Sequence, residues 1–396
     1  MNVLRSVKTA TGMLLRLPLF RQQNDAPSVI SRQLLNHQGN LNLFRLPVPP
    51  IDYLPPDVPN EAICQRLIRA YRHADTGKSA DGVWESIDAR CHRALIGFLR
   101  AEDVSNVARV LSQMFVDPVT SGLALGRDAY VLTKRDPYLP ALDWHDKAIA
   151  LGVACGVIPA QNPEQGEYGT QLRLDSVDVL RRVAEFLRID PAPPQVGGLF
   201  GVRFASSVIP VNQLLHVYTA HRITTLAGAR PYSCLEIGGG VGLLAYLAHS
   251  MGARRFCIAD LPLVNVLQGY VLLSSGVAGA VRLFGEQDSP DERTISIVPD
   301  WYVEQMEPRS FDLVVNQDSM PEMAHATMRR YLTVIPKIAH GYFLSINQEA
   351  QAPAPGTDPQ GWVHAACRSS AQLQLLYRAP YWLRKGYVEE VYRIAG

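Results

Sequence analysis

The sequence has few of the features that mark disulfide-rich, membrane-spanning or nucleic-acid-binding proteins. Its 396 residues include six cysteines but no C-x-x-C pair, which argues against a zinc ribbon and against a disulfide framework. No apolar run approaches the roughly 20 residues that cross a bilayer. The formal net charge is only +1, so no overall field attracts nucleic acid. These absences predict a cytoplasmic protein with no transmembrane segment and no nucleic-acid partner.

Prolines and glycines divide the chain into two parts. With 47% hydrophobic and 19% charged residues the composition is that of a globular protein, and the length suffices for two domains. A cluster of prolines and glycines over residues 191–198 indicates a linker. We expect a mostly helical N-terminal or lid domain over residues 1–195, partly irregular over residues 1–58. An α/β catalytic domain is expected over residues 196–396.

Helical periodicity recurs through the first part of the chain. Residues 1–21 combine basic and apolar positions, which predicts a helix docked on the protein's own core or on a second subunit, as in a homo-oligomer. A helix lying on a membrane surface is the alternative. The further predicted helices are Glu61–Tyr71, Trp84–Leu99, Val104–Phe115, Leu142–Val157, Asp175–Leu187 and Pro210–Ala227.

The segment Ser233–Asp260 carries the clearest signal for a ligand site. It predicts a strand through Ile237, a glycine turn, a helix over Leu243–Met251 and a second strand ending at Asp260. Such a β–α–β unit presents backbone N–H groups and a helix N-terminus at the carboxyl ends of its strands, where nucleotide-like ligands bind. Glycine allows the backbone to turn tightly and to approach a ligand, and the turn contains Gly238, Gly239, Gly240 and Gly242.

Two cofactors compete for this glycine turn. Gly240-x-Gly242-x-x-Ala245 matches the dinucleotide fingerprint, with Asp260 at about the position of its ribose-binding acid. The glycines also form the pattern E-x-G-x-G-x-G beginning at Glu236, where a carboxylate would repel a pyrophosphate. That carboxylate suits the ammonium and sulfonium charges of S-adenosylmethionine. We therefore favour S-adenosylmethionine over NAD, with Glu236 near the methionine end and Asp260 on the ribose hydroxyls.

Further strands complete a predicted sheet. Apolar or β-branched runs predict strands at Thr294–Val298, Phe311–Asn316 and Gly341–Ile346, and two closing strands within Tyr381–Ile394 around Lys385-Gly386. The tight connection of the last two implies antiparallel pairing at one edge of the sheet. Residues at the ends of strands or just after them are candidates for cofactor contacts, namely Leu261, Asp300, Trp301 and Asn316. Asp300 and Trp301 are placed at the adenine, and a turn with a buried tryptophan is the alternative.

A second polar segment, Asn316–Met323, follows the fourth strand of this sheet. Asp318 and Glu322 lie close together in it, and loops at the carboxyl ends of neighbouring parallel strands face the same ligand. Polar groups directly after a buried strand cost free energy unless they meet a ligand or one another. The segment also fits a capping box with Ser319 as N-cap and Glu322 as its partner. His325 would then lie on the first turns of a helix and point toward the same ligand site.

Several motifs of the second half occur together in one known family. They are L-E-I-G-G-G-V-G, A-D-L-P, F-D-L-V-V-N-Q-D-S-M-P-E-M, Y-F-L-S-I-N-Q-E and A-P-Y-W-L-R-K-G-Y-V-E-E-V-Y. This set, roughly over residues 195–396, resembles the sugar O-methyltransferases of bacterial polysaccharide and glycan loci, within the class I S-adenosylmethionine-dependent superfamily. The N-Q-D-S-M-P-E-M segment is the specific part.

The resemblance implies a fold, a cofactor and an acceptor. The fold is a Rossmann-like seven-stranded sheet, mostly parallel, with an antiparallel edge hairpin and a largely helical N-terminal domain. The cofactor is S-adenosylmethionine, and the acceptor is a hydroxyl of a sugar or glycan. Because the helical half matches no motif, a polyketide or phenol acceptor and a catalytically silent partner protein stay open as alternatives.

Methyl transfer to a hydroxyl requires removal of its proton, because a sugar hydroxyl is a weak acid. We assign Asp318 as the base, with Glu322, His325 and Asn347 as second choices and the loop residue His364 as an alternative. Carboxylate oxygens also suit Mg²⁺. Metal coordination by Asp318 and Glu322 is therefore the alternative to a metal-free site, which we favour.

Overall fold

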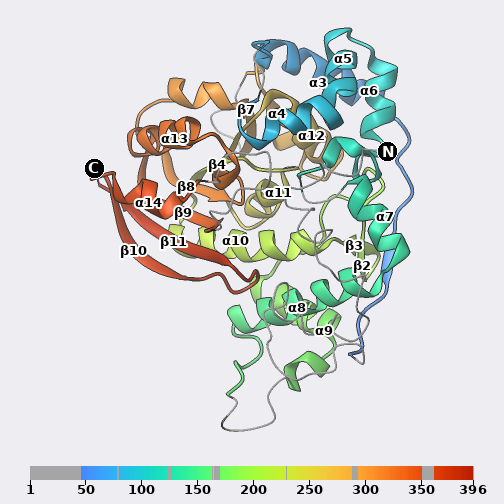
Figure 1. Ribbon diagram of the computed structural model, residues 1–396, viewed down its shortest axis with the longest axis vertical. Helices are drawn as coiled ribbons and strands as arrows, with labels where there is room; N and C mark the ends of the chain where they lie inside the picture. The colour runs from blue at the N-terminus through green and yellow to red at the C-terminus, as the bar shows by residue number, and fades with distance from the viewer. Residues whose placement is uncertain are drawn as a thin grey trace, which may run out of the picture.

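A computed structural model describes most of the chain, and a twisted sheet of eight strands forms its centre (Figure 1). The described residues are 46–77, 80–123, 126–162, 164, 170–228, 230–287, 293–349 and 361–395. The helix expected over residues 1–21 lies outside them. Among the described residues, no helix combines the length and the apolar character needed to cross a bilayer.

The central sheet is mostly parallel, as predicted. In spatial order its strands are β10 (Leu373–Pro380), β11 (Tyr387–Ile394), β9 (Ala339–Gln348), β8 (Phe311–Gln317), β4 (Ser233–Ile237), β5 (Arg255–Asp260), β7 (Thr294–Pro299) and β6 (Val281–Leu283). From β9 to β6 every neighbouring pair is parallel, and β11 is antiparallel to both β9 and β10. The mostly parallel Rossmann-like sheet with an antiparallel edge hairpin is thus confirmed. The eighth strand, β6, was not predicted, because three residues are too short to show a period of two.

The edge hairpin is longer than predicted. Both of its strands were expected within Tyr381–Ile394, but β10 ends at Pro380 and residues 381–386 form the connection. The prediction was wrong because Tyr381 and Leu383 look like strand residues. They belong instead to the connection, with their side chains buried at 3% and 0% exposure.

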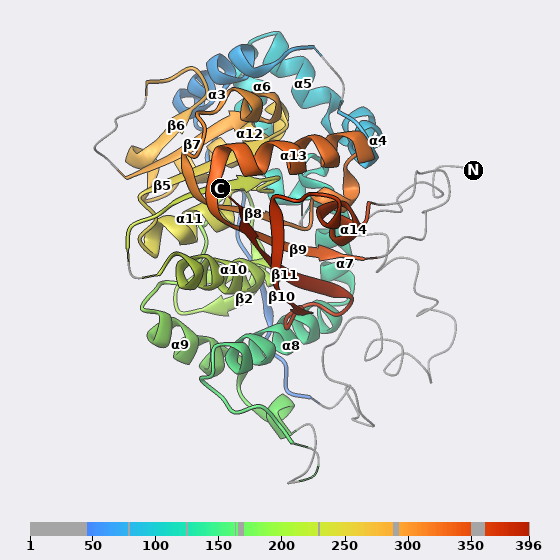
Figure 2. The ribbon, with the colours of Figure 1, turned by 90° about the vertical axis from the view of Figure 1, so that its left-hand side faces the viewer.

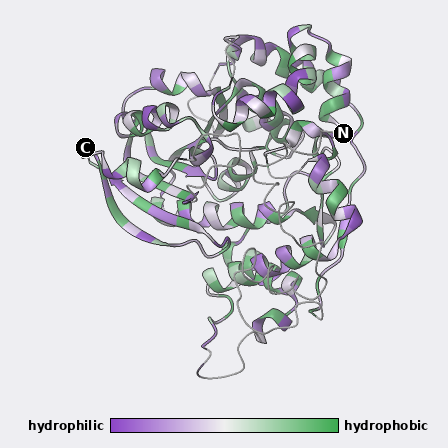
Figure 3. Cartoon of the chain, in the orientation of Figure 1, coloured by the Kyte–Doolittle hydropathy of each residue, from purple (hydrophilic) through white to green (hydrophobic). Residues whose placement is uncertain are grey.

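Helices cover both faces of the central sheet (Figure 2). One face packs against α10 (Val211–Ala227), α11 (Leu243–Ser250) and α12 (Pro262–Leu273), and the other against α13 (His325–Ile338) and α14 (Val363–Arg368). Side chains alternate between these faces along β4, where Cys234 lies in the first core and Leu235 in the second. The strands and the helices α11 and α12 are correspondingly apolar (Figure 3).

The helical part of the chain comprises seven α-helices in the described residues. They are α3 (Glu61–Ala74), α4 (Val83–Ile87), α5 (Arg93–Arg100), α6 (Val104–Leu111), α7 (Arg127–Arg135), α8 (Tyr138–Ala154) and α9 (Ser176–Leu187). The helix predicted over Trp84–Leu99 is interrupted by a π-helical turn at Asp88–His92, and α7 was not predicted. Asp103 and Asp175 cap their helices, each accepting a hydrogen bond from a backbone N–H of the first turn.

The helical part packs directly on the helices of the central sheet. The strand β1 (Ile51–Tyr53) pairs with β2 (Phe200–Phe204), which continues into β3 (Ser207–Ile209), so the small sheet joins both parts of the chain. Helix α3 lies against α12 and α8 against α10, and one continuous apolar core includes residues of all four helices. The crossing of α3 and α12 is close, because a Cβ on Gly269 would lie 2.5 Å from Cδ2 of Leu67.

This close crossing predicts opposite effects for two glycine-to-alanine substitutions. Gly97→Ala in α5, where nothing lies within 4 Å of the new Cβ, should raise the free energy of unfolding by about 0.5–1 kcal/mol through helix propensity. Gly269→Ala should instead lower it by about 1–3 kcal/mol, because the buried Leu67 and Leu283 side chains must shift. Urea denaturation measures both. Equal stabilisation by the two substitutions would show that the crossing is loose.

Candidate functional site

The glycine turn between β4 and α11 uses its glycines for different reasons. A Cβ on Gly238 would lie 2.1 Å from Oγ of Ser319, and one on Gly239 would lie 2.9 Å from Oε2 of Glu236. These two glycines therefore accommodate the protein's own packing. At Gly240 (φ +56°) no described atom lies within 4 Å of the Cβ position, so the space above it is free for a ligand.

Glu236 lies beneath this turn as a buried carboxylate. The residue is 2% exposed, and its Oε2 atom has no hydrogen-bond partner among the described residues. Burial, and in second place the charge of Asp260, raises the pKa of Glu236 to about 8. A carboxylate held in this way is stabilised by a positively charged ligand, and phosphate would be repelled.

Asp260 stands next to Glu236 at the end of the neighbouring strand β5. Its Oδ1 accepts a hydrogen bond from the N–H of Leu261 at 2.8 Å, and its Oδ2 accepts one from Nε2 of Gln268 at 2.8 Å. Burial raises the pKa of Asp260 to about 7, although these two hydrogen bonds oppose the shift. Gln268 also donates to the carbonyl of Gly240 at 3.1 Å, so one side chain fixes both the acid and the turn.

The predicted adenine residues, Asp300 and Trp301, directly follow strand β7, where it meets helix α3. Trp301 donates its Nε1–H to the carbonyl of Ala74 at 3.0 Å, and its ring contacts Phe284 edge to face at 5.3 Å. Asp300 is half-buried and is paired with Arg330 at 3.3 Å. The structure thus ties Trp301 to the helical part through its polar edge.

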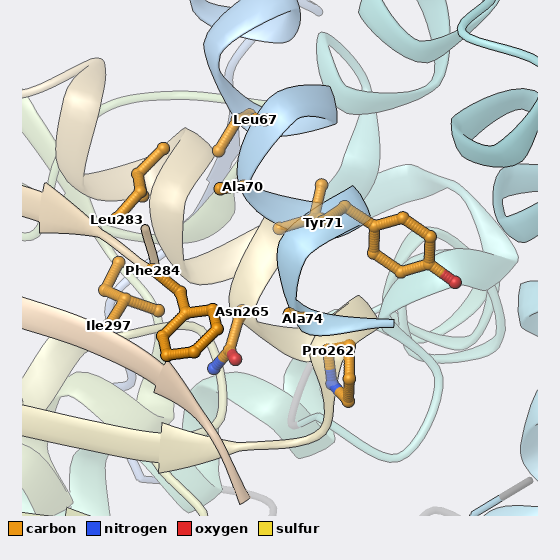
Figure 4. Close-up of a pocket in the computed structure, with 10 residues that line it drawn as sticks. Leu67, Ala70, Tyr71, Ala74, Pro262, Asn265, Leu283, Phe284 and Ile297 are labelled. Carbon is orange, nitrogen blue, oxygen red and sulfur yellow. The ribbon is translucent and has the colours of Figure 1, made fainter. Parts of the chain in front are cut away.

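A small, mostly apolar cavity lies beside these residues, between α3, α12 and the ends of β6 and β7. The amide of Asn265 lies beside the Phe284 ring at this cavity (Figure 4). Asn265 is 8% exposed, and its Oδ1 has no partner among the described residues, while its Nδ2 donates to Gln268 at 3.0 Å.

The segment after β8 is bound to the end of the glycine strand. Asn316 donates from Nδ2 to the carbonyl of Ile237 at 2.8 Å, and Ser319 donates from Oγ to the same carbonyl at 3.1 Å. Asn316 also accepts a hydrogen bond from Nδ2 of Asn347 at 2.9 Å. The predicted capping box is therefore wrong, because the Ser319 hydroxyl is used across the sheet. A 3₁₀ turn, Met320–Glu322, precedes α13 in place of a capped helix start.

Asp318 and Glu322 both lie in this segment, but their surroundings differ. Asp318 accepts hydrogen bonds from Nη1 of Arg384 at both oxygens, at 3.1 and 3.0 Å. Glu322 is half-buried, and its side chain has no hydrogen-bond or ion-pair partner among the described residues. Burial, then the charge of Asp318, raises the pKa of Glu322 to about 8, and Arg384 opposes this shift.

The candidate histidines are placed differently from one another. His325 is exposed at the first position of α13. His364 was expected to be solvated in a loop, but it lies on α14 with its Nδ1 2.6 Å from Oε1 of Glu390. In the described part of the chain no group of three His, Cys, Asp or Glu residues has the arrangement of a metal site.

Arg384 and Tyr381 are site residues that the sequence analysis missed. Arg384 lies over the Tyr387 ring at 4.0 Å, and the charges nearest to it include Asp318, Glu322 and Asp143 of helix α8. The Tyr381 hydroxyl is buried without a partner among the described residues. The R-K-G segment was the only available signal, and a basic residue at a hairpin connection is ordinarily solvated.

No protein-family model and no curated protein matches this sequence. Among solved structures, a methyltransferase from Mesorhizobium loti is similar to it at 13% identity over 45% of this chain and 97% of that one, with a TM-score of 0.32. The N-methyltransferase NodS from Bradyrhizobium japonicum is similar at 15% identity over 47% and 97%, with a TM-score of 0.35. The CcbJ methyltransferase from Streptomyces caelestis is similar at 15% identity over 45% of this chain and 88% of that one, with a TM-score of 0.33. Since all these TM-scores are low, we infer function from the side chains at the strand ends.

The buried, unpartnered Glu236 predicts a pH-dependent stability. An unfolded glutamate has a pKa of about 4.3, so the ligand-free protein loses stability as the pH rises from there through the folded value of about 8. Glu236→Gln should match the wild type near pH 5 and exceed it by about 1–3 kcal/mol at pH 8.5. Urea denaturation at the two pH values measures this difference.

Glu389 is the matched control, because it is also buried but accepts hydrogen bonds from Tyr218 and Arg222. Glu389→Gln should destabilise the protein at pH 8.5, since it leaves a half-buried guanidinium without its partner. Destabilisation by Glu236→Gln at pH 8.5 would show that Glu236 is satisfied in the ligand-free protein.

Proposed function

We propose that the protein is an S-adenosylmethionine-dependent O-methyltransferase. The observation that carries the proposal is the buried Glu236 carboxylate without a partner, next to Asp260 and beneath an open glycine turn. A ligand with an ammonium group, ribose hydroxyls and a sulfonium matches this arrangement of charges. S-adenosylmethionine supplies a methyl group activated for transfer by that sulfonium.

The residues of the site fit this cofactor one by one. Glu236 would hold the cationic methionine end, and Asp260 would accept hydrogen bonds from the ribose hydroxyls, with Leu261 beside it. The open position at Gly240 leaves room for close approach, and Gly238 and Gly242 shape the turn. Asp300 and Trp301 would border the adenine. Asn316 is fully buried and would act by holding the turn and the polar loop together.

A dinucleotide fits the same site less well. Its pyrophosphate would lie at the glycine turn, directly above two carboxylates with raised pKa values. A pyrophosphate would oppose the ionisation of both acids and has no donor for their oxygens, whereas an ammonium group stabilises their ionised forms. The charge of the site therefore supports S-adenosylmethionine over NAD.

The acceptor mouth, which we define as Asp318, Glu322, Tyr381, Arg384 and Tyr387, supports a polyhydroxylated acceptor. It combines two carboxylates, a guanidinium and phenol hydroxyls, which can hydrogen-bond to many hydroxyls at once. A sugar or glycan hydroxyl fits such a surface better than a phenol or polyketide, which needs an apolar slot. The mouth supplies carboxylates that orient the acceptor and receive its proton.

Cofactor binding is predicted to depend on pH and to release protons. Glu236 and Asp260 are partly protonated at pH 7, and a cationic ligand with ribose hydroxyls binds their ionised forms. The affinity for S-adenosylhomocysteine should therefore rise between pH 6 and pH 8. Isothermal titration in buffers of different ionisation enthalpy at pH 7 should show proton release, and Asp260→Asn should weaken binding by about 1.5–3 kcal/mol. Binding of NAD without any response to S-adenosylhomocysteine would refute the proposal.

The acceptor class can be tested by transfer of a labelled methyl group. The purified protein is incubated with labelled S-adenosylmethionine and with nucleotide sugars, oligosaccharides, phenols or polyketides. We expect label in the sugar fractions, on oxygen. Label in the phenol or polyketide fractions alone would refute the sugar acceptor and leave the methyltransferase activity standing. Cofactor binding without transfer to any acceptor would favour a silent partner protein.

A further inference from the structure

The polar loop after β8 lies directly on the glycine turn. The Ser319 Oγ atom is 2.1 Å from a Cβ built on Gly238, and the Cε atom of Met323 is 3.8 Å from it. Glu322 lies between these two residues in the sequence. A Cβ built on Gly82 of the helical part would lie 2.7 Å from the backbone carbonyl oxygen of Glu322, so the two backbones are in close contact. The loop is thus held on both sides, and its carboxylates cannot move far from the turn.

Asp318 is held in place on three sides. Its N–H donates to the carbonyl of Ile346 at 3.0 Å, and its backbone has a φ of +68°, which few side chains tolerate. Both of its oxygens accept hydrogen bonds from Arg384, and the Tyr387 hydroxyl also bonds to it. A carboxylate that is already bonded to a guanidinium and a phenol is fixed in orientation, and fewer of its lone pairs are free to accept a further hydrogen bond.

Glu322 has the opposite surroundings. Two negatively charged residues lie on this side of the loop. One is Asp318, and the other is Asp81, which accepts a hydrogen bond from the N–H of Ala324. The positively charged neighbour is Arg384, which is engaged with Asp318, and Tyr387 is the remaining titratable neighbour. Because no cation pairs with the Glu322 side chain in the described structure, its ionised form is poorly stabilised and its affinity for a proton is raised.

We propose that the two carboxylates have separate tasks, with Glu322 receiving the proton of the acceptor hydroxyl and Asp318 with Arg384 positioning the acceptor. The inference rests on the proposed methyl transfer. As the acceptor oxygen forms its bond to the methyl carbon, the carbon–sulfur bond breaks and its electron pair goes to sulfur. The hydroxyl proton passes to an Oε atom of Glu322, and the resulting carboxylic acid then releases it to water.

The protonation of Glu322 can be measured without an acceptor. A water-soluble carbodiimide reacts with protonated carboxyls, and glycinamide then traps the product as an amide that mass spectrometry locates. At pH 7 a carboxyl with a pKa near 8 is mostly protonated, whereas an ordinary glutamate is almost fully ionised. We expect Glu322 to be labelled more strongly than Asp318 and more strongly than exposed surface carboxylates. Stronger labelling of Asp318 than of Glu322 would reverse the assignment.

Two substitutions test the coupling between the carboxylates in opposite directions. Asp318→Asn removes the negative neighbour and leaves Arg384 free to pair with Glu322, so labelling of Glu322 at pH 7 should fall several-fold. Arg384→Gln removes the cation, so labelling should stay at the wild-type level or increase. Circular dichroism checks that both variants fold. Unchanged labelling in Asp318→Asn would contradict the proposed arrangement.

Kinetics with the acceptor found by methyl-transfer screening test the chemical role. Glu322→Gln should slow kcat by roughly 10²–10⁴-fold and remove the rise of kcat toward pH 8. Asp318→Asn should mainly raise KM and keep that rise, displaced to lower pH. Wild-type turnover in Glu322→Gln, or loss of the pH dependence only in Asp318→Asn, would overturn the proposal.

Binding of S-adenosylhomocysteine separates this proposal from the function on which it rests. Both Glu322→Gln and Asp318→Asn should bind it as the wild type does. A wild-type protein that fails to bind it refutes the methyltransferase function, whatever the labelling shows. Normal binding combined with the reversed kinetic pattern refutes only the division of tasks.

Discussion

Glu236, the penultimate residue of the central strand β4, has its carboxylate out of water and one oxygen without a partner among the described residues. Such a group destabilises the ligand-free fold, and its pKa moves upward so that the neutral form is favoured. Asp260, on the adjacent strand, has the same tendency. Ionisation of the two acids is therefore favoured only when a ligand brings positive charge or hydrogen-bond donors to them.

The carbonyl of Ile237 connects this acidic floor to the acceptor side. Two side chains of the next loop, Asn316 and Ser319, donate hydrogen bonds to it. The loop consequently approaches Gly238 so closely that a Cβ would collide with Ser319. The glycine at this position serves the packing of two loops, and the close approach of a ligand concerns Gly240. The same few hydrogen bonds hold the proposed cofactor and acceptor residues close together, as the proposed in-line methyl transfer would require.

The helical part contributes to both ends of the site. The end of α3 accepts the Trp301 indole hydrogen bond beside the predicted adenine position. At the other end, α8 brings Asp143 near Arg384. The α3–α12 and α8–α10 interfaces belong to one continuous apolar core with the sheet helices. On the proposed function, the helical part borders the acceptor mouth, so acceptor specificity could change there without altering the glycine turn.

Features carried by short stretches of sequence could be predicted from the sequence alone. One example is the segment Ser233–Asp260, whose strand, glycine turn, helix and second strand were all predicted. Apolar periodicity and glycine conformation are local properties, so the sequence shows them directly. The nearness of the glycine turn to the loop with Asp318 and Glu322 also followed, because parallel strands place their carboxyl ends at one edge.

Other features were decided only by the tertiary structure. Asp318 and Arg384 are 66 residues apart, and only the hairpin connection at residues 381–386 brings them together. The Ser319 hydroxyl has a good local use as a helix cap, yet it bonds to Ile237, 82 residues away. In both cases the partner of a polar side chain is selected by the path of the folded chain. The protonation of Glu322 depends on which neighbour that path supplies, because charge interactions act through space and not along the sequence.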